Sequence, residues 1–168
     1  AVRSQGGLKN SNLVTAATLT DFNLQEYWLK AEEKGIDLIT SGKVNALYSD
    51  DKLSGSAELK INLISPDSIK GDFITAFSYD PAQKNAELSL MTENSQAAGM
   101  PFELSLKADY DGKYIHVNNF NLDDKLVVSG WTNISDYFDS GFSLYTDSLD
   151  FAKYWTMFPR IIPDVEGQ

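Results

Sequence analysis

The chain lacks cysteine entirely, which excludes disulfide bridges and metal sites built on thiolates. It contains one histidine, His116, so a His-based metal site or a His-assisted nucleophile has a single candidate. No apolar run approaches the roughly 20 residues of a membrane-spanning helix, and we expect no membrane insertion by this segment. The chain starts at Ala1 without a methionine, which we interpret as a fragment of a longer, repetitive protein.

Positive charge is scarce as well. The 24 acidic residues outnumber the 14 basic ones, which gives a formal net charge of −10. Such a chain repels nucleic acids and anionic membrane surfaces, and no local basic stripe offsets the repulsion. We therefore expect no nucleic-acid partner.

Signatures of catalysis are also missing. The chain has no Gly-x-Ser-x-Gly elbow, phosphate loop or dinucleotide fingerprint. His116 lies in an alternating segment, where a hydrogen-bonded or exposed strand histidine is expected rather than a catalytic one. The pairs Asp50–Asp51 and Asp123–Asp124 stand on turns, where neighbouring carboxylates point apart. The sequence predicts no enzyme, no cofactor and no metal site, and it leaves calcium binding by these acidic turns open.

What the chain does have is strict alternation of apolar and polar residues. From Leu53 to Leu63 every odd position is apolar or glycine and every even position is polar, and the pattern returns from Phe102 to Tyr110. Since side chains alternate faces along a strand, each such strand should have one dry face and one wet face. The predicted strands cover residues 12–20, 24–33, 36–48, 53–63, 71–79, 85–92, 101–110, 113–122, 125–134 and 141–147.

Turns and one helix complete the prediction. The pair Asp111–Gly112 is the best candidate for a type I′ hairpin turn, and residues 95–99 are predicted to be a flexible loop. Near the C-terminal end, Ser148 can cap a helix with aromatic residues at helical spacing, which Pro159 would end. The aromatic positions of this helix are Phe151, Tyr154, Trp155 and Phe158.

These elements predict a mainly β fold that forms a single segment over residues 1–168. We expect an elongated, curved, antiparallel-rich sheet, shaped as a half-open β-trough, with one short C-terminal helix. The alternative is a β-sandwich. A trough leaves its dry face without a second sheet over it, whereas a sandwich closes two matched dry faces against each other.

The chain also repeats a unit of strand, acidic turn and strand. The two copies run from Gly42 to Ser56 and from Gly112 to Trp131. Within them and just beyond, Asp50–Leu63 and Asn119–Trp131 resemble the repeats of AsmA-like and TamB-like proteins. The closing stretch Ser148–Gly167 is similar to the junctions of that family, in which a short helix, a proline and the next strand follow one another. The resemblance covers residues 36–168.

The resemblance implies a half-open sheet whose concave face is lined with aliphatic and aromatic side chains. Such grooves lie in the periplasm of Gram-negative bacteria, on a protein that is anchored in the inner membrane. They are thought to carry phospholipids toward the outer membrane, and some members act with an outer-membrane β-barrel assembly protein. The resemblance therefore implies a lipid-conduit segment in outer membrane biogenesis, with phospholipid as its ligand and such a barrel protein as a partner of the parent chain.

The predicted lipid-binding groove consists of the inward-facing apolar residues. An acyl chain gains roughly 0.8 kcal/mol per methylene moved from water into an apolar trough, and no polar recognition residue is required. Gly55 and Gly130 are expected where a strand bends or another backbone approaches. The groove residues are Leu53, Ala57, Leu59, Ile61, Leu63, Phe73, Phe77, Leu88, Leu90, Phe102, Leu104, Leu106, Val128 and Phe142. In a closed sandwich the same residues would be ordinary core.

Two other functions fit the same pattern. The first is an extracellular β-sandwich binding module, either an adhesin or a carbohydrate-binding domain, with a platform of aromatic rings outside its core. The second is a structural repeat that spaces other domains. The three functions differ in geometry, because only the lipid conduit needs an apolar face that stays open.

Overall fold

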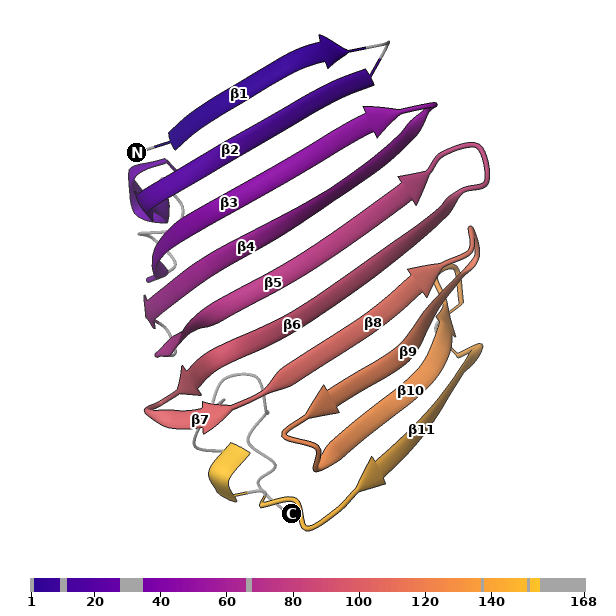
Figure 1. The fold of residues 1–168 in the computed structure, drawn as a ribbon. Helices are drawn as coiled ribbons and strands as arrows, with labels where there is room; N and C mark the ends of the chain where they lie inside the picture. Colours follow the sequence, from indigo (N-terminus) through magenta and orange to yellow (C-terminus); the bar gives the residue numbers. More distant parts are fainter. Residues whose placement is uncertain are drawn as a thin grey trace.

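The computed structural model describes residues 2–9, 12–27, 35–65, 68–136, 138–150 and 152–154. Within these ranges the chain forms one antiparallel sheet of eleven strands that is not closed into a barrel, and Figure 1 shows the strands side by side. The predicted mainly β fold, with an open sheet and one short C-terminal helix, is confirmed. All the described strands belong to one sheet, so the alternative of a β-sandwich is wrong for this part of the chain.

The sheet is a meander, in which each strand pairs with the strands that precede and follow it in the sequence. The order is β1-β2-β3-β4-β5-β6-β8-β9-β10-β11, and β7 lies off this path because it pairs with β6. Short connections suffice because neighbouring antiparallel strands need no crossover. The strands are β1 (Val2–Lys9), β2 (Asn12–Asn23), β3 (Asp37–Ser49), β4 (Lys52–Ser65), β5 (Ile69–Asp80), β6 (Asn85–Ala97), β7 (Met100–Phe102), β8 (Leu104–Tyr110), β9 (Tyr114–Leu122), β10 (Leu126–Asn133) and β11 (Ser140–Thr146).

The predicted strand over residues 24–33 is wrong at its start. A 3-10 helix, η1 (Leu24–Glu26), stands there, and residues 28–33 lie outside the described part of the chain. The side chain of Asn23 accepts a hydrogen bond from the Gln25 N–H (3.0 Å), which offers the backbone a local alternative to the strand ladder. Strand β1 is not predicted by the sequence, because the pair Gly6–Gly7 interrupts the apolar pattern.

Two further predicted boundaries need correction. The predicted strand over residues 101–110 is two strands, because the N–H of Glu103 donates to a carboxylate oxygen of Asp123 (2.6 Å) instead of continuing the ladder. The predicted loop over residues 95–99 is shorter than expected. Ser95–Ala97 extends β6 and pairs with β7, so only Ala98 and Gly99 form the turn.

The type I′ geometry predicted for Asp111–Gly112 occurs at other turns. Positive φ at both central residues is found at Asp50–Asp51 (50° and 60°) and at Asp123–Asp124 (55° each). At the predicted turn only Gly112 has a positive φ (96°). Aspartate tolerates the left-handed region because its short carboxylate can hydrogen-bond locally, so these acidic pairs serve as turn residues.

Of the C-terminal helix the structure describes residues 152–154, and Asp150 caps it. A carboxylate oxygen of Asp150 accepts the N–H of Lys153 (3.1 Å), as an N-cap does. The predicted cap, Ser148, is wrong, because its φ is 52° and its hydroxyl donates to Asp147. The predicted helix residues Phe151, Trp155, Phe158 and Pro159 lie outside the described residues.

The buried core is small and lies where this helix meets the sheet. Its fully buried members are Ala97, Phe102, Leu122 and Tyr154, which come from four different elements. Residues around them, Ile69, Met100, Leu104, Phe120, Leu126 and Leu149, are partly buried against this cluster. Among the described residues, no helix has both the length and the apolar composition to cross a membrane.

Two glycines let bulky rings lie flat on the sheet. Gly55 stands directly opposite Phe77 on the neighbouring strand, and Gly130 stands directly opposite Phe142. A Cβ atom at Gly55 would lie 2.7 Å from the Phe77 ring and 2.6 Å from the carbonyl oxygen of Asn45. A Cβ atom at Gly130 would clash with the Phe142 ring and the backbone of β11. The expectation of close approach at Gly55 and Gly130 is confirmed.

We predict that Gly130→Val lowers the free energy of unfolding by about 1–3 kcal/mol, the usual cost of overpacking. The control is Gly7→Val, because a Cβ atom at Gly7 meets nothing within 4 Å. There the higher strand propensity of valine should leave stability unchanged or raise it by up to about 1 kcal/mol. Urea denaturation of both variants measures the difference. Equal stability of the two variants would contradict the role given to Gly130.

Candidate functional site

The register of the sheet sorts its side chains onto two faces of opposite character. We call the face that carries Leu59, Phe73 and Leu106 the apolar face, and the face that carries Lys60 and Asp72 the polar face. Because cross-strand partners point to the same side, the pairing extends each face across the sheet. One continuous row on the apolar face contains Ala46, Gly55, Phe77, Leu88, Ala108, Val117, Gly130 and Phe142.

Charge is confined to the polar face. In the paired stretches of β2 to β11 that the structure describes, every Asp, Glu, Lys and His side chain alternates away from the apolar face. Opposite charges pair there across strands, as Lys60 does with Asp72 (4.0 Å) and Lys52 with Asp80 (3.0 Å). The hydrogen bond from Lys52 lowers the pKa of Asp80 below its usual value. The apolar face therefore offers a ligand dispersion contacts rather than charge.

Large parts of the apolar face are open to solvent. Leu88 is 43% exposed, Phe142 is 61% exposed and Leu144 is 64% exposed. Within the described part of the chain, residues that are fully buried on this face are few and gather mainly beside the C-terminal helix. A soluble protein seldom leaves a contiguous apolar surface of this kind uncovered unless something binds there.

The structure places every predicted groove residue on the apolar face. Phe102 is fully buried beneath the C-terminal helix, Ala57 is buried at mid-sheet, and the remainder are half-buried or exposed. The predicted residues are Leu53, Ala57, Leu59, Ile61, Leu63, Phe73, Phe77, Leu88, Leu90, Phe102, Leu104, Leu106, Val128 and Phe142.

Further apolar residues share this face and were not among the predicted ones. Some continue the same alternation on strands already identified and could have been found from it. Others, such as Phe120 and Leu122, follow a β-bulge near Asn118 that shifts the alternation by one residue. The additional residues include Leu13, Leu38, Val44, Tyr48, Ile69, Tyr79, Tyr110, Ile115, Val117, Phe120, Leu122, Leu126 and Leu144.

The C-terminal helix covers one end of the apolar face through Tyr154. The ring of Tyr154 is buried against Phe102 and Leu122, and its hydroxyl donates to a carboxylate oxygen of Asp123 (2.5 Å). The ammonium group of Lys153 donates to the same oxygen (2.8 Å). Burial and the bond to Asp123 raise the pKa of Tyr154. Partial burial alone would raise the pKa of Asp123, but the bonds from Lys153 and Tyr154 lower it overall.

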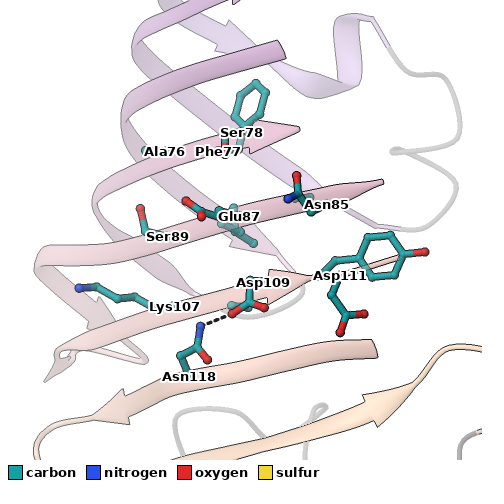
Figure 2. Close-up of a pocket in the computed structure, with 14 residues that line it drawn as sticks. Ala76, Phe77, Ser78, Asn85, Glu87, Ser89, Lys107, Asp109, Asp111 and Asn118 are labelled. Atoms are coloured by element: carbon teal, nitrogen blue, oxygen red, sulfur yellow. Dashed lines mark hydrogen bonds between the residues drawn. The ribbon is translucent and has the colours of Figure 1, made fainter. Parts of the chain in front are cut away.

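The polar face has a hollow of about 560 Å³ over β5, β6, β8 and β9, shown in Figure 2. Its polar lining includes Glu87, Lys107, Asp109 and Asn118, and Asn118 donates a hydrogen bond to Asp109. Apart from this bond, these side chains are spread over three strands, β6, β8 and β9, and do not converge on one point. We therefore assign the hollow no ligand.

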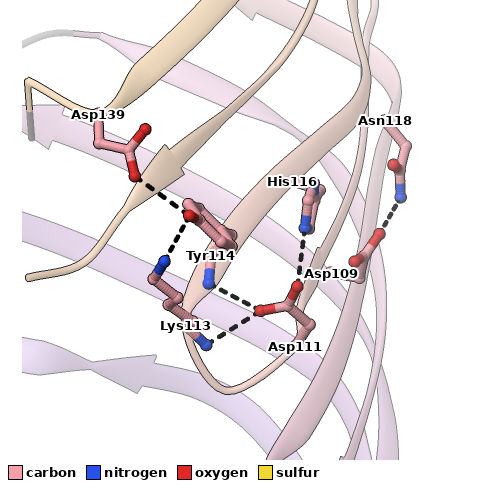
Figure 3. Close-up of polar contacts among 7 residues, drawn as sticks. All are labelled: Asp109, Asp111, Lys113, Tyr114, His116, Asn118 and Asp139. Carbon is pink, nitrogen blue, oxygen red and sulfur yellow. Dashed lines mark hydrogen bonds and ion pairs between the residues drawn. The ribbon is translucent and has the colours of Figure 1, made fainter.

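A second polar cluster, shown in Figure 3, ties the β8–β9 turn together. One carboxylate oxygen of Asp111 accepts the N–H groups of Lys113 (3.0 Å) and Tyr114 (2.7 Å). The other lies 3.2 Å from the His116 ring. His116 is thus a hydrogen-bonded strand histidine. These bonds, those from the backbone above all, lower the pKa of Asp111 to about 2.

Neither cluster has the geometry of a metal site or of a ring platform. Among the described residues, no group of three or more potential ligands could hold a metal ion. Tyr114 and Trp131, two neighbouring rings on the polar face, stand edge to face at 90° with centroids 5.5 Å apart. A sugar-stacking platform needs rings that present a common flat surface, so this pair does not provide one.

Comparisons with models of protein families, with curated proteins and with solved structures found no match to this chain. The resemblance to AsmA-like and TamB-like proteins stays a prediction.

We predict that the Asp111 carboxyl titrates near pH 2 in an NMR titration, well below its usual value of 3.8. Because the lowered pKa favours the ionised form, its contribution to stability is complete above pH 3.8 and is lost as the pH falls toward 2. His116→Gln should move this pKa only slightly, because the backbone N–H groups are the larger cause. A return to the ordinary value in that variant would assign the effect to the histidine instead.

We predict that Tyr154→Phe lowers the free energy of unfolding by about 1.5–3 kcal/mol, the usual worth of a hydrogen bond to a charged group. The substitution keeps the ring in the core and removes only the bond to Asp123. Tyr145→Phe is the control, because Tyr145 is 62% exposed and should change stability by less than about 0.5 kcal/mol. If urea denaturation gives the same result for both variants, the helix is not held by this bond.

Proposed function

We propose that this chain is a segment of a lipid-conduit protein whose apolar face shields the acyl chains of phospholipids from water. The observation that carries the proposal is the combination of three properties on one face. The face is continuous across the sheet, it carries no charge in the paired stretches of β2 to β11, and its apolar side chains are partly open to solvent.

The dimensions of the face suit a long acyl chain. Strands β3 to β6 have 12–14 residues, which corresponds to about 40 Å at roughly 3.3 Å per residue. One leaflet of a bilayer core is only about 15 Å thick, half of the usual 30 Å. An acyl chain can therefore lie on the face in either direction and leave its headgroup in water beyond the rim.

The energetics also favour lipid over a polar ligand. Burying an acyl chain gains roughly 0.8 kcal/mol for each methylene, so about fifteen methylenes give a gross gain near 12 kcal/mol. Immobilisation of the lipid reduces this figure. No directional hydrogen bond is needed, which agrees with the lack of polar side chains along rows such as that from Ala46 to Phe142.

The place of action follows from the resemblance alone and belongs to the same proposal. The segment would work in the periplasm, as part of a parent protein anchored in the inner membrane. Phospholipid would pass along the face toward the outer membrane, and the parent chain would act with an outer-membrane β-barrel assembly protein. Neither a nucleic acid nor a catalytic step has a role in this proposal.

We predict that phospholipid co-purifies with the protein from a bacterial host and that Leu59→Asp together with Leu106→Asp removes it. These side chains lie on the apolar face, where a carboxylate would have to stay hydrated. Native mass spectrometry with lipid extraction from the same sample measures the bound lipid.

The matched control is Asn62→Asp together with Ser105→Asp. It places the same charges on the same strands, β4 and β8, but on the polar face. The control should keep its lipid, and circular dichroism should show an intact sheet in both variants. Lipid-free wild-type protein, or equal loss of lipid from both double variants, would contradict the proposal.

A further inference from the structure

Within the part of the chain that the structure describes, strand β11 forms one edge of the sheet and lacks the usual protection against strand pairing. Its 7 residues, Ser-Gly-Phe-Ser-Leu-Tyr-Thr, contain no charged residue and no proline. Among the described strands only β10 pairs with it, so its outer edge has no strand beside it there. Natural edge strands are normally interrupted by charge, proline or a bulge, because a bare edge is a template for another strand.

The direction of its backbone groups is fixed by the hydrogen bonds at its two ends. Asn133 N–H donates to the Asp139 carbonyl (3.0 Å), and Asp147 N–H donates to the Lys125 carbonyl (2.9 Å). In an antiparallel pair the bonded positions alternate, so odd-numbered residues between these ends face β10. The N–H and C=O groups of Phe142, Leu144 and Thr146 therefore point out of the sheet.

The side chains of β11 are also exposed on both faces of the sheet. Phe142 and Leu144 end two rows of the apolar face and are 61% and 64% exposed. Tyr145, on the polar face, is 62% exposed. A strand laid along this edge would cover side chains on both faces while its backbone bonds to the outward groups.

The opposite edge of the sheet differs. Strand β1 carries the exposed Arg3, and the pair Gly6–Gly7 has no side chains to pack against a partner. A charged residue and weak strand formers protect an edge from pairing. The bare edge at β11 is thus a property of that strand and not of both ends of the sheet.

The acidic residues on both sides of β11 favour a partner strand with basic ends. Asp139 and Asp147 lie directly before and after the strand, and Asp136 and Asp150 lie a few residues beyond them. One carboxylate oxygen of Asp139 already accepts hydrogen bonds from Tyr114 (3.1 Å) and Asn133 (3.1 Å), so an incoming cation would approach the other oxygen. In an antiparallel pair of two β11 strands, Asp139 of each copy would lie beside Asp147 of the other. The net charge of −10 on each copy adds to this repulsion.

We propose that β11 is a docking edge for an extended strand of another protein, uncharged along its length and basic at both ends. The incoming strand adds to the sheet by β-augmentation. Its backbone bonds to Phe142, Leu144 and Thr146, its apolar side chains continue the apolar face, and its terminal Lys or Arg residues meet Asp139 and Asp147.

The test uses the whole chain and a fluorescent peptide, Lys-Thr-Val-Thr-Val-Thr-Val-Thr-Lys, with binding followed by fluorescence anisotropy at low ionic strength. A peptide with the same core and Glu at both ends is the matched probe. We expect the Lys-ended peptide to bind at least about tenfold more tightly than the Glu-ended one. High salt should reduce the difference, because the charges lie at the solvent-exposed rim.

The variant Leu144→Pro tests the edge itself. The N–H of Leu144 points outward, so proline removes a docking donor without breaking a bond to β10. Peptide binding should be lost while circular dichroism stays that of the wild type. Should this variant not fold, Leu144→Lys keeps the backbone and places a charge on the edge that repels the Lys-ended peptide. The lipid-face variant Leu59→Asp should bind peptide normally, which separates this proposal from the proposed lipid function.

Three results would overturn the proposal. Unchanged binding to a folded Leu144→Pro variant would place the peptide elsewhere. Equal affinity of the two peptides would remove the role of the flanking aspartates. A concentration-dependent dimer of the wild type that Leu144→Pro abolishes would show that a second copy occupies the edge instead.

Discussion

The structure depends on the register between strands, which keeps a two-residue alternation aligned across the sheet. A slip of one residue would turn every side chain of a strand to the other face and place Lys60 beside Phe73. The acidic hairpins help to prevent such a slip. At Asp50–Asp51 a two-residue turn with positive φ sets the pairing of Ser49 with Lys52, from which the rest of the register follows. At Asp123–Asp124 a turn that also has positive φ at both residues sets the pairing of Leu122 with Leu126.

Much of the sheet could be predicted from the sequence, because alternation is a local property. Strand β4 is an example, since the polarity of each residue from Leu53 to Leu63 indicates the face of the sheet on which its side chain lies. The break at Glu103 could not be predicted, because it depends on a hydrogen bond to Asp123, which is distant in sequence. The sandwich alternative could not be removed for the same reason. Long-range pairing between strands decides whether a second sheet covers a dry face. The alternation along a single strand carries no information about that pairing.

The residues of the candidate site also fall into those that the sequence predicts and those that it does not. Residues on regular strands, such as Leu104 and Leu106, follow from the pattern alone. On β9 the apolar positions change from odd to even between Val117 and Phe120, because a bulge inserts one extra residue there. If the alternation of the first half of β9 is extended past Asn118, the side chains of the second half are assigned to the wrong face of the sheet. Bulges are set by the partner strand, so sequence periodicity finds the site only between them.

The meander has a consequence for the length of the molecule. Apart from β7, which pairs with β6 beside the main path, each described strand pairs with the strands before and after it, so strand-pairing interactions are summed along one axis, as in repeat proteins. Removing one hairpin, for instance β4 with β5, would let the flanking strands meet in the same direction and with the same faces aligned. A fold of this kind can become longer or shorter in steps of two strands while its apolar surface stays unbroken. The length of the sheet can thus change without any change in the side chains that line each strand pair.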